Sequence, residues 1–236
     1  MSLLCIDSGN TRLKWGLRDG GRWLAQGTRL DAVDARPARV LACNVAGDAP
    51  RQSIESFAAR HGLPVEWLHA RAAQGGVTNG YDHPEQLGAD RWGALIGARA
   101  LHRGDCIVVM SGTATTVDVL AADGRFRGGL ILPGLRLMRE ALAGGTANLP
   151  VAEGRFAEQP RNTFDAIASG AVQATAGAIE RMFRQIAGGS NPLCLLSGGA
   201  ATVVAGASPP LTFAHRVVDN LVLEGLAAIA AASDHA

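Results

Sequence analysis

A short polar stretch near the start of the chain holds residue types that could bind a phosphate group. Asp7, Gly9 and Asn10 directly follow the apolar run Leu3–Ile6. A glycine turn after a buried strand can present backbone N–H groups to phosphate oxygens, because no Cβ blocks the approach. A carboxylate just before that turn could hold hydrated Mg²⁺ against a triphosphate. Lys14, the single lysine among 22 basic residues, adds a compact positive charge where arginine is otherwise the rule.

The same design recurs at Cys106–Asp118, where a second apolar run leads into a turn containing Gly112 and Thr113. Each stretch predicts a strand, a tight turn and a returning strand. A plain hairpin, with Asp7 and Asn10 serving the turn, would account for the first stretch alone. The recurrence favours a nucleotide site, because two facing glycine turns could clamp a triphosphate. The chain has no Walker-type P-loop and no Gly-x-Gly-x-x-Gly pattern, so the site would be of this hairpin kind.

A second group of reactive residue types lies at Asp90 and Arg91. The segment 81–92 leads from a turn-prone loop into an amphipathic helix and places both residues in its first turn. A carboxylate there could accept the proton of a substrate hydroxyl that attacks phosphorus. Arg91 could neutralise an anionic substrate or the transferred group. Helix capping alone also favours Asp at this position, by about 1 kcal/mol, so the pattern by itself does not establish a catalytic role.

The composition excludes several classes of protein. With 22 Lys plus Arg against 21 Asp plus Glu, the chain lacks the excess basic charge typical of nucleic-acid and membrane-surface binding. A hydrophobic content of 47% excludes a disordered chain. The four cysteines show no zinc-ligand spacing, and the first residues lack the features of a signal peptide. We therefore expect a cytoplasmic protein without a nucleic-acid or membrane partner.

The elements that would position these residues are strands interleaved with helices along the chain. This alternation is typical of the α/β class. Hydrophobic spacing predicts four helices, at Gln52–His61, Gly88–Leu101, Leu135–Leu142 and Thr163–Ala187. The run Leu193–Ala200 predicts a strand that passes into a glycine-rich turn, which could face a nucleotide or be a plain joint. Because the two hairpins share one design, we expect two similar halves, residues 1–103 and 104–236.

Taken together and in order, these motifs resemble those of the type III pantothenate kinases, a family of the actin, Hsp70 and sugar-kinase superfamily. The resemblance spans nearly the whole chain and consists of six motifs: Asp7-x-Gly9-Asn10-Thr11, Tyr81 with Pro84 and Gly88-x-Asp90-Arg91, Gly112-Thr113-Ala114-x-Thr116-x-Asp118, Gly128-Gly129-x-Ile131-x-Pro133-Gly134, Asn162-Thr163 with Ser169-Gly170, and Leu221-x-Leu223-Glu224-Gly225-Leu226. It implies two duplicated ribonuclease-H-like halves with ATP bound in the cleft between them.

The resemblance also implies an activity and its residues. Such an enzyme phosphorylates the primary hydroxyl of pantothenate with ATP and Mg²⁺ to give 4'-phosphopantothenate, the first step of coenzyme A biosynthesis. Asp90 would be the general base, and Asp7 would hold Mg²⁺ through water. The ATP phosphates would be bound by Asp7, Ser8, Gly9, Asn10, Thr11, Arg12, Leu13, Lys14, Gly112 and Thr113. Pantothenate would be bound by Tyr81, Gly88, Ala89, Asp90, Arg91 and Thr163. Family members are homodimers with the substrate pocket at the subunit interface, which Thr163 would reach from the partner chain.

One position departs from the family pattern. The family carries Asp two residues before Gly112, where it helps to bind a required monovalent cation, K⁺ or NH₄⁺, whereas this chain carries Met110. A thioether is a poor ligand for K⁺, a hard ion that prefers oxygen. We therefore expect that the protein either works without K⁺ or has lost activity.

Two other interpretations stay open. A kinase for another small alcohol would keep both hairpins and change the region from Tyr81 to Arg91. A non-catalytic regulator built on the same fold would account for Met110. The joint presence of Asp7, Asp90, Arg91 and Asp118 favours an active kinase, because a regulator needs no general base.

Overall fold

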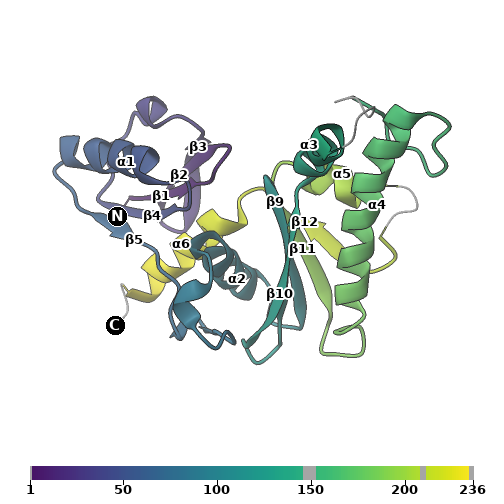
Figure 1. The fold of residues 1–236 in the computed structure, drawn as a ribbon. Helices are drawn as coiled ribbons and strands as arrows, with labels where there is room; N and C mark the ends of the chain where they lie inside the picture. The colour runs from purple at the N-terminus through teal and green to yellow at the C-terminus, as the bar shows by residue number, and fades with distance from the viewer. Residues whose placement is uncertain (1, 146–152, 208–210, 234–236) are drawn as a thin grey trace. The chain divides into compact units, whose positions relative to one another are not determined.

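The computed structural model describes residues 2–145, 153–207 and 211–233, which form two compact units (Figure 1). The first unit comprises the described residues up to His102, the short segment Gly124–Phe126 and the described residues from Asn220 onward. The second unit comprises Arg103–Asp123 and the described residues of Arg127–Asp219. The compact units are therefore not two consecutive pieces of chain, and the division into halves at residue 103 stays a prediction.

The first unit contains a mixed five-stranded sheet. Its strand order is β3 (Arg22–Gly27), β2 (Leu13–Asp19), β1 (Leu3–Ser8), β4 (Arg39–Asn44) and β5 (Val65–Trp67). The predicted hairpin is confirmed, because β1 pairs antiparallel with β2, whereas β1, β4 and β5 run parallel. One face of the sheet packs against helix α1 (Asp48–Arg60) through Ile54, Phe57 and Ala58. This face forms the core that holds the strand bearing Asp7.

The second unit repeats this arrangement. Its strand order is β10 (Phe126–Pro133), β9 (Ala114–Leu120), β8 (Cys106–Ser111), β11 (Leu193–Ser197) and β12 (His215–Val217). The predicted second hairpin is again confirmed, with β8 and β9 antiparallel and β8, β11 and β12 parallel. Helices α3 (Leu135–Gly145), α4 (Thr163–Phe183) and α5 (Ala201–Ala205) belong to this unit. The predicted α/β class and the duplicated hairpin design are both present.

The four predicted helices are found with shifted ends. Helix α1 begins earlier than expected, α4 ends earlier, and α2 (Ala89–Leu101) matches closely. The remaining short elements are β6 (Ala73–Gln74), β7 (Val77–Thr78), η1 (Leu30–Ala32) and η2 (Pro84–Gln86). All four cysteines are buried and free. Within the described ranges, every helix is too short or too polar to serve as a membrane span.

Helices α2 and α6 (Leu221–Ser233) of the first unit lie side by side with their backbones in close approach (Figure 1). A Cβ on Gly225 would overlap the carbonyl oxygen of Gly93, and a Cβ on Gly97 would overlap that of Leu221. Only glycine therefore allows this spacing. Because α2 carries Asp90 in its first turn, the contact with α6 determines where that carboxylate lies.

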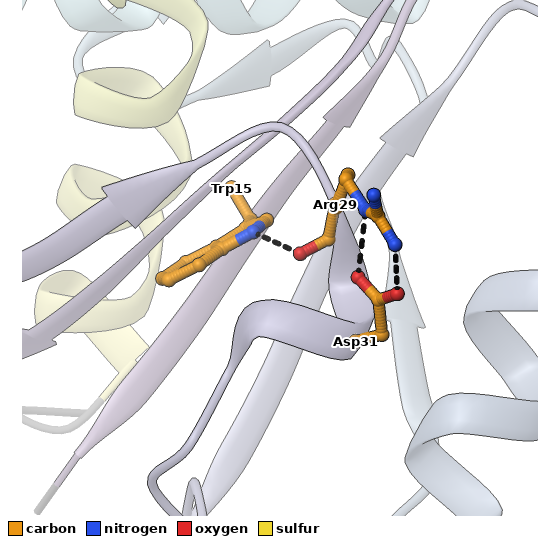
Figure 2. A network of polar contacts seen from close by, with 3 residues as sticks. All are labelled: Trp15, Arg29 and Asp31. Atoms are coloured by element: carbon orange, nitrogen blue, oxygen red, sulfur yellow. Dashed lines mark hydrogen bonds and ion pairs between the residues drawn. The ribbon is translucent and has the colours of Figure 1, made fainter.

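Trp15 lies next to Lys14 on β2, and its side chain contacts a neighbouring segment of the chain (Figure 2). The indole is 4% exposed, and its Nε1 donates a hydrogen bond of 2.8 Å to the carbonyl oxygen of Arg29. The Arg29 guanidinium forms an exposed ion pair with Asp31 (Figure 2). An exposed pair contributes little stability by itself. The hydrogen bond from the buried indole therefore connects β2 to the segment at Arg29.

Candidate active site

The turn between β1 and β2 places Asp7 and Lys14 together. The two residues are direct partners in the antiparallel register, so their side chains extend from the same face of the sheet. The backbone N–H of Gly9 donates to the Arg12 carbonyl oxygen at 3.2 Å, which closes a tight turn. Asn10, Thr11 and Arg12 in the turn are exposed, so a ligand could reach them. The predicted turn is therefore present, and its role in binding phosphate stays a prediction.

Asp7 has an unusual environment. Its Oδ1 is shielded from solvent and has no hydrogen-bond partner among the described residues. Burial, together with the charge of Asp90, raises the pKa of Asp7 to about 7, although Lys14 acts in the opposite direction. A shielded carboxylate oxygen without a donor is costly unless a cation or proton compensates it. The site is therefore suited to a positively charged ligand.

Replacing Asp7 with Asn should stabilise the ligand-free protein more at pH 8 than at pH 5. The folded pKa is raised, so the folded state binds the proton more tightly than the unfolded state. The associated stability is complete below the ordinary pKa of 3.8 and is lost as the pH rises through about 7. At about 1.4 kcal/mol for each pKa unit, the gain from Asp7→Asn should grow by a few kcal/mol across this range.

Thermal unfolding of both proteins at several pH values measures this difference. Asp31→Asn is the control, because the hydrogen bond from Arg29 lowers the pKa of Asp31 and its removal cannot produce the same trend. A gain from Asp7→Asn that did not grow with pH would contradict the assigned environment.

Asp90 lies in the first turn of α2, as predicted. Its Oδ1 accepts a hydrogen bond of 2.8 Å from the backbone N–H of Arg91, and a Cβ on Gly88 would lie 2.8 Å from the same oxygen. Burial is the main cause that raises the pKa values of Asp7 and Cys43, neighbours on the paired strands β1 and β4, and the charge of Asp90 raises both further. The structure thus brings Asp7, Lys14 and Asp90 into one electrostatic environment from two distant segments.

Arg91 is only 5% exposed and packs among aromatic rings. Its Nη1 donates a hydrogen bond of 2.8 Å to the hydroxyl of Tyr81. Its Cζ lies 5.6 Å from the centre of the Tyr81 ring and 5.8 Å from that of Phe126. Sequence reasoning had selected Arg91 and Tyr81 but not Phe126. No local pattern could have indicated Phe126, because it is the first residue of β10 and lies 35 residues after Arg91 in the sequence.

In the second unit, three glycine-containing turns meet. The N–H of Gly112 donates to the Ala114 carbonyl oxygen at 3.0 Å, and that of Gly134, just before α3, donates to Thr113 at 2.9 Å. The N–H of Ala200 donates to the carbonyl oxygen of Ser111 at 3.1 Å. Turns with closely approaching backbones can bind phosphate or nucleotide groups. The sequence indicated the turn at Gly112 and the turn near Ala200 separately, and only the structure shows that they meet each other and the turn before α3.

Met110 lies on β8 directly opposite Thr116 of β9. The Thr116 hydroxyl is shielded from solvent and has no hydrogen-bond partner among the described residues. Within the same residues, no group of three or more His, Cys, Asp or Glu side chains could hold a metal ion. A thioether facing one hydroxyl is a poor donor set for a hard monovalent cation.

Thr163 is exposed at the first position of α4. The side chain of Asn162 caps this helix by accepting a hydrogen bond of 2.9 Å from the N–H of Asp165, which confirms the predicted start. The second unit contains three of the residues predicted to bind ATP or pantothenate, Gly112, Thr113 and Thr163. The other residues predicted to bind these substrates belong to the first unit.

Comparison with known proteins identifies the family. A sequence model described as Type III pantothenate kinase matches residues 22–185. A type III pantothenate kinase of Aromatoleum aromaticum is 55% identical over 238 residues, which cover 97% of each chain. One from Azoarcus sp. is 47% identical and covers 98% of this chain and 91% of its own. The chain belongs to the type III pantothenate kinase family. The predicted family is thereby confirmed, and with it the class of ATP-using kinases.

Solved structures agree with this family at the level of fold. A putative Baf family transcriptional activator from Campylobacter jejuni matches with a TM-score of 0.62 at 16% identity, covering 99% of this chain and 100% of its own. A putative N-acetylmannosamine kinase from Listeria monocytogenes matches with a TM-score of 0.55 at 14% identity, covering 99% and 100%. The activator of 2-hydroxyisocaproyl-CoA dehydratase from Clostridium difficile, with bound ADPNP, matches with a TM-score of 0.51 at 16% identity, covering 100% and 95%. The chain therefore shares the fold of these three proteins.

Proposed function

We propose that this protein transfers the γ-phosphoryl group of ATP to the primary hydroxyl of pantothenate and so begins coenzyme A synthesis. The observation that carries the proposal is the 55% identity with a type III pantothenate kinase over 97% of the chain. The proposed function is also supported by a cluster of charged residues in the first unit, Asp7, Lys14, Asp90 and Arg91. These residue types supply the positioning, the charge neutralisation and the base that phosphoryl transfer needs.

Asp90 acts as the general base in this proposal. As the pantothenate oxygen forms its bond to the γ-phosphorus, the bond from that phosphorus to the β–γ bridging oxygen breaks and ADP leaves. The hydroxyl proton passes to the Asp90 carboxylate. The hydrogen bond from the N–H of Arg91 to Oδ1 orients that carboxylate at the start of α2. A base held on a helix terminus needs little rearrangement before it accepts the proton.

The ATP phosphates are assigned to the β1–β2 turn and to the turn at Gly112 and Thr113. Asp7 fits the role of a Mg²⁺ ligand, because its shielded Oδ1 has no donor among the described residues. A single carboxylate suits Mg²⁺, which keeps several waters and binds phosphate oxygens. When bound, the ion neutralises charge on the triphosphate. Lys14, opposite Asp7, adds a second positive charge for the same phosphates.

Pantothenate is assigned to the residues around the start of α2. Tyr81 and Arg91 present polar groups there, and Gly88 keeps the backbone open beside the Asp90 carboxylate. In the homodimer that we propose, Thr163 of the partner chain completes the pocket. The exposure of Thr163 at the end of a capped helix is compatible with that role.

The monovalent cation does not fit this chain. Met110 stands where the family pattern has Asp, and the Thr116 hydroxyl opposite it lacks a hydrogen-bond partner among the described residues. We therefore predict that turnover changes by less than about twofold when tetramethylammonium replaces K⁺, because a thioether cannot replace an oxygen ligand. Met110→Asp, which supplies a carboxylate opposite Thr116, should make the rate depend on K⁺. A large activation of the unmodified enzyme by K⁺ or NH₄⁺ would contradict this prediction.

The test of the proposed function measures ADP formation from MgATP with and without pantothenate. We expect ADP only when pantothenate is present, together with an equal amount of phosphorylated product. Turnover with another small alcohol, but not with pantothenate, would indicate a kinase for a different acceptor. Thermal stabilisation by nucleotide without turnover, and without a further shift by pantothenate, would indicate a regulator.

A further inference from the structure

The connection between β9 and β10 ends in the first unit rather than in the second. Gly124–Phe126 belong to the first unit, although β9 and the rest of β10, from Arg127 onward, belong to the second. The N–H of Thr78 in β7 donates to the Gly124 carbonyl oxygen at 2.9 Å, and Thr78 also forms a parallel bridge with Arg125. Gly124 has a φ of +88°, and a Cβ there would overlap the carbonyl oxygen of Gly76, so only glycine suits this position. The segment Gly124–Phe126 is therefore held tightly against β7.

Phe126 extends from this anchored segment into the predicted pantothenate site. Its ring is 0% exposed and lies 5.2 Å from the ring of Tyr81, at an angle of 43°. The Arg91 guanidinium carbon lies within 6 Å of both ring centres, at 5.6 and 5.8 Å. A guanidinium near aromatic faces is attracted by their quadrupoles, and this attraction strengthens when water is excluded. Phe126 and Tyr81 together thus restrict the buried Arg91 side chain.

We infer that Phe126 is a positioning residue that orients Arg91 for binding the acidic substrate. The inference rests on the proposed function, in which Arg91 belongs to the pantothenate site. An arginine side chain loses considerable rotamer freedom when it binds a ligand. Two rings and the hydrogen bond to Tyr81 fix that side chain before pantothenate arrives. The substrate then does not have to order it, which raises affinity.

The test replaces Phe126 with Leu, which removes the ring and keeps an apolar side chain. We expect the KM for pantothenate to rise about tenfold, with kcat and the KM for ATP changed by less than about twofold, because ground-state binding is lost and the base remains. Phe126→Met, whose longer and more flexible side chain can adapt to the space left by the ring, serves the same purpose if the Leu variant does not fold.

The matched control is Phe57→Leu. Phe57 is a buried ring of the same unit, 3% exposed, and it lies 5.7 Å from the guanidinium of Arg60, outside the predicted site. This variant should lose stability while both KM values stay unchanged. Equal kinetic changes in the two variants would mean that Phe126 acts only through general stability, and would overturn the inference.

A double-mutant cycle shows whether Phe126 acts through Arg91. In an Arg91→Gln background, Phe126→Leu should cause no further rise in the KM for pantothenate. Independent, additive effects would overturn the inference, as would an unchanged KM in folded Phe126→Leu. Absence of pantothenate-dependent turnover in the unmodified protein would instead defeat the proposed function.

A spectroscopic measurement provides a readout apart from turnover. Tyr81 is the single tyrosine of the chain, so selective ¹³C labelling of tyrosine gives one set of ring resonances. Phe126→Leu should shift these resonances, because it removes a ring 5.2 Å away, and Phe57→Leu should leave them in place. Unshifted resonances in Phe126→Leu would contradict the contact on which the inference depends.

Discussion

Replacing Asp90 with Asn should lower kcat by about 10²- to 10⁴-fold, the usual contribution of a general base. The amide has nearly the same shape as the carboxylate, and its oxygen can still accept the hydrogen bond from the Arg91 N–H. The start of α2 should therefore stay in place, and the KM values for ATP and pantothenate should change little. The value of kcat falls because the variant lacks the base that accepts the proton of the substrate hydroxyl.

Steady-state kinetics of Asp90→Asn measures this loss, and Asp82→Asn is the matched control. Asp82 is an exposed carboxylate in the same 81–92 segment, so its replacement should leave kcat unchanged. The pKa of Asp7 gives a second readout, because the charge of Asp90 adds to the rise that burial causes. In Asp90→Asn, the pH range in which Asp7 destabilises the ligand-free protein should move downward. A kcat within tenfold of the original would exclude Asp90 as the base.

Replacing Gly225 with Ala should destabilise the first unit strongly. The new Cβ would overlap the carbonyl oxygen of Gly93 in the facing helix. Overlap with backbone cannot be relieved by a rotamer change, so α2 and α6 must separate. Overpacking typically costs about 1–3 kcal/mol, and a backbone contact belongs at the upper end of that range. For a chain of 236 residues, we expect Tm to fall by about 10 °C.

Gly177→Ala provides the control for this substitution. Gly177 lies on the exposed side of α4, and a Cβ there would have no atom within 4 Å. Alanine should stabilise that helix by up to about 1 kcal/mol through its higher helix propensity. Thermal unfolding of both variants distinguishes crowding from propensity. An unchanged Tm for Gly225→Ala would mean that α2 and α6 do not approach as closely as described.

Elements with a local pattern could be predicted from the sequence. Both hairpins pair residues that are near neighbours in the chain, so their apolar runs and Ser-Gly turns were sufficient evidence. Helices α1 to α4 have a periodic apolar face. The strands β3, β4, β5, β10 and β12 were not predicted. Several of them are short or half-exposed, and their pairing depends on strands that lie far away in the sequence.

The candidate site likewise has some properties that the sequence predicts and others that depend on the tertiary structure. The sequence by itself determined which residue types could bind phosphate, supply a base and bind an anion, because those properties belong to the side chains and their immediate neighbours. Only the tertiary structure decided that Asp7 has a shielded oxygen and a raised pKa, and that Phe126 lies against Arg91. Burial and electrostatic environment arise from segments that are distant in the chain, and no local pattern records which of them will meet.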